Sequence, residues 1–163
     1  MCGSSGEFIK GAESWFSLGM LQTREDVLDD GQGWIRRPTD QRVRLGIFFQ
    51  DHLPNDPTLR AYINVQYGTG FPFGPPRQPN RRSSLSGADY KRIDLGVSKL
   101  VLIEQSCRWV PLESLWIGLE MLNVLNSNNP ISYLWVQAFN GDQYAVPNSQ
   151  TQRFINLRLV GKF

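Results

Sequence analysis

The 163-residue chain has little of what most catalytic or metal sites require. His52 is its only histidine, which excludes an acid–base pair or a metal cluster built on histidines. Cys2 and Cys107 are its only cysteines, and they have neither the spacing of a metal site nor the number of a disulfide framework. We therefore expect no enzymatic activity, no bound metal and no cofactor.

Long hydrophobic runs and a strong net charge are also missing. No segment approaches the roughly 18 consecutive apolar residues of a membrane-spanning helix. The net charge of +2 is too small to indicate a nucleic-acid partner. No apolar signal peptide precedes Cys2, which is odd for an exported protein and suggests that the true amino terminus lies elsewhere. Low hydropathy does not exclude a membrane β-barrel, whose strands are only half apolar.

What the sequence does contain is alternation of apolar and polar residues over long segments. The period of two is clearest in four segments: RVRLGIFFQD, LRAYINVQYG, YKRIDLGVSK and FINLRLVGKF. Each is about ten residues long, which exceeds the usual strand of five or six residues and matches the tilted strand that crosses a bilayer. SWFSLGMLQT follows the pattern less closely, and LESLWIGLEMLNVLN fits a strand and an amphipathic helix equally well.

The connections between these segments differ in length. HLPNDPT is short, whereas the regions at about 25–40, 68–89 and 127–151 are long and rich in Gly, Pro and polar residues. The last of them contains a possible hairpin, SYLWVQAF against QYAV. Short turns on one side and long loops on the other are typical of membrane barrels.

No motif for catalysis is complete. His52 lies beside Pro54 at a predicted turn, and the GTGFPFG segment is followed by prolines where a phosphate-binding helix would have to begin. DVLDDG lacks two ligands of a calcium loop. Aromatic side chains on the long loops are candidates for ligand contact. With one loop arginine they give the candidate ligand-binding set Trp34, Arg36, Phe71, Phe73, Trp135 and Tyr144.

Several phrases, in order along the chain, carry a family resemblance: GWIRRPTDQRVRLGIFFQDHLPNDPT, YGTGFPFGPPR, YKRIDLGVSK, LEMLNVLNSNNPISYLWV, YAVPN and RFINLRLVGKF. Together they resemble the carboxy-terminal end of TonB-dependent outer-membrane receptors, in the group with a carboxypeptidase-regulatory-like amino-terminal domain. The resemblance runs from about Ser14 to Phe163. It favours the strand interpretation of LESLWIGLEMLNVLN.

The resemblance implies an all-β fold, an antiparallel meander of about six long strands that forms the carboxy-terminal segment of a 22-stranded transmembrane barrel. Residues 14–163 would supply these strands, and residues 1–13 would be the end of a preceding strand or a disordered start. The long connections would be extracellular. The implied function is import of a scarce nutrient, such as a siderophore, cobalamin, glycan or peptide, across the cell outer membrane.

The resemblance also assigns roles to the two faces of the strands. Polar residues would face the lumen: Arg42, Arg44, Arg60, Asn64, Gln66, Arg92, Asp94, Glu120, Asn156 and Arg158. The last strand would carry the assembly signal on its lipid face: Ile155, Leu157, Leu159 and Phe163. The implied partners are outer-membrane lipid, the missing plug and remaining strands, the TonB complex and the outer-membrane assembly machinery.

An open sheet of six strands would expose unpaired backbone groups at two edges, each costing several kcal/mol in hydrocarbon. We therefore expect a truncated fragment that is not active alone. The alternative is a soluble all-β ligand-binding domain, a sandwich or a lipocalin-like barrel, with the apolar face turned inward. A third arrangement is a small barrel closed by several copies of the chain.

Overall fold

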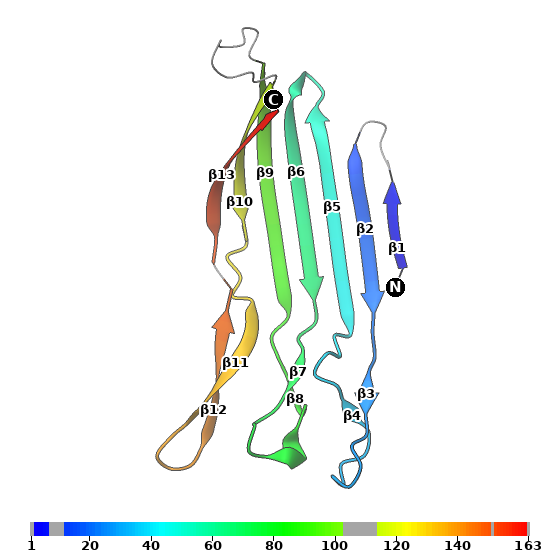
Figure 1. The fold of residues 1–163 in the computed structure, drawn as a ribbon, viewed down its shortest axis with the longest axis vertical. Coiled ribbons are helices and arrows are strands. Elements are labelled where there is room, and N and C mark those ends of the chain that lie inside the picture. Colours follow the sequence, from blue (N-terminus) through cyan, green and yellow to red (C-terminus); the bar gives the residue numbers. More distant parts are fainter. Residues whose placement is uncertain (1, 7–11, 103–113, 151, 163) are drawn as a thin grey trace.

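The chain forms an antiparallel β-sheet in which strands that follow one another along the sequence lie side by side (Figure 1). The structure is a computed structural model and describes residues 2–6, 12–102, 114–150 and 152–162. The sheet has seven strands in the order β1-β2-β5-β6-β9-β10-β13. They are β1 (Cys2–Gly6), β2 (Glu13–Met20), β5 (Val43–Leu53), β6 (Asp56–Gly68), β9 (Tyr90–Leu102), β10 (Ser114–Leu122) and β13 (Phe154–Lys162). The predicted all-β antiparallel meander is confirmed.

The strand interpretation of the ambiguous segment is also confirmed, because β10 pairs along its length with β9 and β13. The backbone hydrogen bonds from β9 and β13 stabilise the strand, although the residues of β10 favour a helix when considered alone. His52 lies on β5 opposite Arg60, so its placement at a turn was wrong; the turn is formed by Pro54 and Asn55. In the described ranges no helix is long and apolar enough to cross a membrane.

Three long connections, 21–42, 69–89 and 123–153, leave the same end of the sheet (Figure 1). The first contains β3 (Arg24–Glu25) and β4 (Ile35–Arg36). The second contains β7 (Pro72–Phe73), the 3₁₀ turn η1 (Pro79–Arg81) and β8 (Leu85–Ser86). The third contains the predicted hairpin, β11 (Pro130–Gln137) paired with β12 (Gln143–Ser149). We call this end of the sheet the loop end.

The register sorts the side chains of β2 to β13 onto two faces, because alternate residues of a strand point to opposite sides. One face, which we call the apolar face, has Leu119 of β10 opposite Val97 of β9 and Leu157 of β13. Its other apolar members are Phe16, Leu18, Met20, Val43, Leu45, Ile47, Phe49, Leu59, Ala61, Ile63, Val65, Ile93, Leu95, Val101, Leu115, Ile117, Met121, Ile155 and Leu159.

No element of the described chain covers the apolar face. Leu119, Leu157 and Ile155 are each about 60% exposed. Ala12 is the only hydrophobic side chain in the described ranges that is buried. The seven described strands do not close into a barrel, since the sheet has β1 at one edge and β13 at the other. The dry interior expected of a sandwich or lipocalin-like domain is therefore not formed by the described residues.

The opposite face, which we call the polar face, carries nine of the ten residues predicted to face a lumen. On this face Gln66 of β6 lies opposite Arg92 of β9, Asn64 opposite Asp94, and Arg60 opposite Ser98. Arg42 lies one residue before β5 and forms an ion pair with Asp40. Phe163 of the predicted assembly signal lies outside the described residues, as does Cys107.

A row of aromatic rings crosses the polar face. Trp15, Phe48 and Tyr62 lie on three neighbouring strands, with ring centroids 6.1 and 6.0 Å apart. A Cβ atom on Gly96 of β9 would lie 2.1 Å from the Tyr62 ring, so this glycine is what allows the ring to lie flat against the sheet. The polar face is therefore partly aromatic, which the alternating pattern does not reveal.

Candidate functional site

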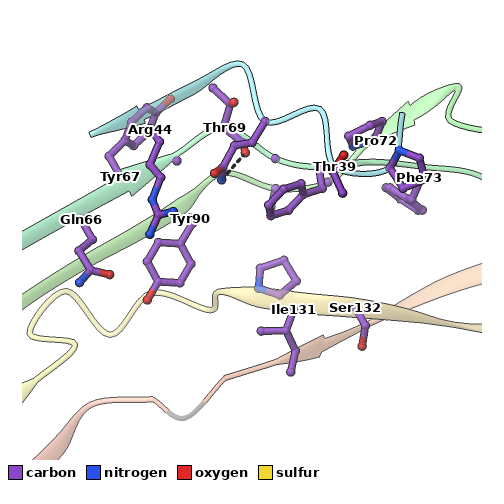
Figure 2. Close-up of a pocket in the computed structure, with 18 of the residues that line it drawn as sticks. Thr39, Arg44, Gln66, Tyr67, Thr69, Pro72, Phe73, Tyr90, Ile131 and Ser132 are labelled. Atoms are coloured by element: carbon purple, nitrogen blue, oxygen red, sulfur yellow. Dashed lines mark hydrogen bonds between the residues drawn. The ribbon is translucent and has the colours of Figure 1, made fainter. Parts of the chain in front are cut away.

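A cavity of about 860 Å³ lies at the loop end of the polar face (Figure 2). Its floor is formed by β2, β5, β6 and β9, through residues that include Ser17, Arg44, Gln66 and Tyr90. Its walls come from the three long connections. Cavities of 300–1,000 Å³ with mainly apolar walls and a few polar groups are typical of small-molecule sites.

The two ends of the second connection are joined to each other by hydrogen bonds, and one more bond joins them to β6. Gly87 N–H donates to the Phe71 carbonyl at 2.8 Å, and Gly70 N–H donates to the Asp89 carboxylate at 3.1 Å. Asp89 also accepts from the Tyr67 hydroxyl at 2.9 Å. These bonds place Phe71 and Phe73 in the cavity wall.

Gly70→Ala should open this wall. A Cβ atom at position 70 would lie 1.8 Å from the Gly87 carbonyl oxygen, and rotation of a side chain cannot relieve a clash with backbone. Overpacking of this kind costs about 1–3 kcal/mol. We expect trypsin to cleave the adjacent Arg77–Arg82 segment about tenfold faster. Gln78→Ala, at an exposed residue of the same loop, is the control and should leave the rate unchanged.

The β11–β12 hairpin forms the opposite wall. Phe73 stacks on Tyr133 with ring centroids 4.1 Å apart and lies 6.0 Å from Trp135. The Tyr133 hydroxyl accepts a hydrogen bond from Ala88 N–H at 3.0 Å. The hairpin is thus joined to the second connection by a ring contact and a hydrogen bond.

The base of the hairpin is fixed by Asn129, whose side chain is almost completely buried. Its Oδ1 accepts from Lys91 N–H at 2.9 Å and its Nδ2 donates to the Lys91 carbonyl at 3.0 Å. Gln150 N–H donates to the Asn129 carbonyl at 2.9 Å. The amide side chain therefore continues the pairing of β9 where the backbone of the connection turns away.

The first connection is organised by Asp40, whose side chain is fully buried. Its carboxylate accepts from Arg36 Nε and Arg42 Nε at 2.8 Å each, and from Thr23 N–H at 2.8 Å. Burial raises the pKa of this carboxyl, but the hydrogen bonds from Arg36, Thr23 and Arg42 outweigh it and lower the pKa to about 2. Thr39 and Gln41, the neighbours of Asp40, line the cavity.

The structure divides the six predicted ligand-binding residues. Phe71, Phe73 and Trp135 line the cavity. Trp34 and Tyr144 are 69% and 56% exposed and lie outside it. Arg36 also lies outside it, where it pairs with Asp40 and donates to Ser86 Oγ at 3.0 Å. Three of the five aromatic candidates therefore line the cavity, and a ligand-contact role for any member of the set stays a prediction.

Sequence reasoning did not select the strand residues that form the floor as ligand contacts. Arg44 and Gln66 were predicted to face a lumen, and Trp15 and Tyr90 received no role. Their membership depends on which ends of β2, β5, β6 and β9 lie together. The sequence did contain a signal for this grouping. The alternating pattern places these residues on one face of the sheet, and the loop lengths place them at the loop end.

Comparisons with known protein families, with curated proteins and with solved structures found no match for this chain. The cavity's own chemistry is therefore the guide to its function. Its walls offer aromatic rings, hydroxyls, amides and one guanidinium, which suit binding of a small molecule. No group of three or more His, Cys, Asp or Glu residues that could bind a metal occurs in the described part of the chain.

Proposed function

We propose that this chain forms part of the wall of a TonB-dependent receptor in the cell outer membrane, which imports a scarce nutrient. The observation that carries the proposal is the uncovered apolar face of the sheet. Exposed apolar patches on soluble monomers rarely exceed a few hundred Å², and larger ones mark interaction with protein or membrane. Lipid is the partner that suits aliphatic side chains spread over six strands.

The distribution of charge along β9 also supports a bilayer. On the apolar face Lys91 and Lys99 flank Ile93, Leu95 and Val97. Eight residues at 3.3 Å each separate the lysines by about 26 Å along the strand, close to the 25 Å height of the apolar band of membrane barrels. Strand tilt shortens this distance, and lysine side chains can extend to reach the interface.

The two edges of the sheet support the remaining part of the proposal. β1 pairs only with β2, and β13 pairs only with β10, among the described strands. Unpaired edge groups cost several kcal/mol each in hydrocarbon, so a membrane-inserted sheet must continue on both sides. Further barrel strands, and a plug against the polar face, would come from chain outside this sequence. The TonB complex and the assembly machinery are the further proposed partners.

Two neighbouring residues of β9 provide a direct test. Val97→Cys and Ser98→Cys, in a background with Cys2 and Cys107 replaced by Ser, put a fluorescent label on opposite faces of the sheet. We expect the full-length protein, with any further strands that belong to the same polypeptide, to fractionate with the outer membrane. Lipids with brominated chains should quench the label at position 97 strongly and the label at position 98 weakly.

Recovery of a folded monomer without detergent would contradict the proposal and favour a soluble binding domain. Equal quenching at the two positions would contradict the assignment of the apolar face to lipid. A barrel assembled from several copies of this chain would give the same quenching but would cross-link as an oligomer.

A further inference from the structure

Arg44 has an unusually open position on the floor of the cavity. It lies on β5 between two glycines on the neighbouring strands, Gly19 of β2 and Gly68 of β6. Gly46, two residues further along β5, is also on this face, and the Trp15 ring lies against it. Because both residues directly opposite Arg44 are glycines, no cross-strand side chain faces it at its own register position, and Arg44 is exposed. Figure 2 shows this guanidinium directed into the cavity beside Tyr90 and Gln66.

The guanidinium also lacks a counter-charge. Arg44 is exposed and takes part in none of the ion pairs formed by the described residues, whereas Arg36, Arg42 and Arg92 each pair with an aspartate. Among the described residues that line the cavity, Arg44 is the only charged one. The site therefore carries a single unneutralised positive charge.

The remaining lining residues suit the body of an organic molecule. Trp15, Phe71, Phe73 and Trp135 supply ring surface, and Ser17, Thr39 and Gln66 supply neutral hydrogen-bonding groups. An arginine presents a planar fork of donors that matches a carboxylate or a phosphate. Apolar walls strengthen such a contact because they lower the local dielectric constant.

We propose that this cavity is a binding site for a small organic anion, whose carboxylate or phosphate is held by Arg44 and whose ring lies against the aromatic wall. The inference rests on the proposed function, because it names the class of ligand that the receptor would take. A segment of protein whose own carboxylate pairs with Arg44 is the competing occupant.

The test measures protection of a cysteine in the cavity. Ser17→Cys, in the background without Cys2 and Cys107, is labelled by a neutral maleimide on the purified full-length chain. Benzoate and phenyl phosphate are the anionic probes, and benzamide is the uncharged probe of the same shape. We expect at least one anion to slow labelling at concentrations where benzamide does not, and the two anions separate carboxylate from phosphate preference.

Substitutions at Arg44 identify the group responsible. Arg44→Gln should weaken binding of the anion about 10- to 150-fold, because a hydrogen bond to a charged group contributes about 1.5–3 kcal/mol. Arg44→Lys should retain part of the binding. Arg60→Gln is the control, since Arg60 lies on the same face but outside the cavity, over Trp116.

Three results would overturn the inference: equal protection by benzamide, protection by none of the probes, or unchanged anion binding in Arg44→Gln. Labelling of intact cells with a membrane-impermeant maleimide separates this inference from the proposed function. Suppose that Ser17→Cys cannot be labelled in cells, but that anions and not benzamide slow its labelling on the purified protein. The anion site is then supported, and the proposed orientation in the membrane is wrong.

Discussion

Leu119→Arg should prevent the chain from assembling stably in the outer membrane. Leu119 lies near the middle of β10 on the apolar face, is 58% exposed and has Val97 and Leu157 as its cross-strand neighbours. An arginine on the lipid face at the bilayer midplane costs about 2–4 kcal/mol, a large part of the stability of a typical domain. The measurement is the amount of folded chain in the outer-membrane fraction, which we expect to fall at least tenfold.

The matched control is Asn156→Arg on the neighbouring strand. Asn156 lies on the polar face, where its amide donates to Glu120 at 3.0 Å, so an arginine there would meet a carboxylate instead of lipid. We expect this variant to assemble almost normally. Equal tolerance of both arginines would mean that the apolar face is not in lipid. Loss of the control alone would mean that the assignment of the two faces is reversed.

The architecture could be predicted because it depends on a pattern that every long strand repeats. The alternation in β5, β6, β9 and β13 is visible residue by residue, and strands that follow one another along the chain usually lie beside one another in a sheet. β10 could not be assigned from its own residues. Its leucines favour a helix locally, and the strand is selected by pairing with β9 and β13.

The cavity could be predicted only in part because its walls depend on contacts between distant loops. Tyr133 contacts Phe73 and Ala88, which lie 60 and 45 residues away in the sequence. Asn129 reaches the backbone of Lys91 across 38 residues. No local pattern distinguishes this buried asparagine from the other asparagines of the NSNNP segment. The ion pair of Arg36 could not be predicted for the same reason, since its partner Asp40 is buried only once the connection folds.

Asp40→Ala should release the first connection from the sheet. The substitution removes the shared acceptor of Arg36, Arg42 and Thr23 N–H and leaves two arginines without a counter-charge. Breaking a buried ion pair costs about 3–5 kcal/mol, but these arginines are partly exposed, so we expect about 2–3 kcal/mol. Amide hydrogen exchange at Thr23 should accelerate about 30- to 150-fold. Asp26→Asn, at an exposed residue of the same connection, is the control.

Acid should reproduce this release in the unmutated chain. The pKa of Asp40 is lowered to about 2 in the folded state from an ordinary 3.8, so the opened connection binds more protons than the closed one between these values. The stabilisation is therefore complete above about pH 5, begins to fall as the pH drops below the ordinary value, and is lost as the pH drops through about 2.

Corrected for the intrinsic rate, exchange at Thr23 should rise over this window in the natural chain and stay flat in Asp40→Ala. A flat profile in both would mean that the carboxylate does not hold the connection. Because Thr39 and Gln41 flank Asp40 and line the cavity, ligand binding should weaken over the same pH range.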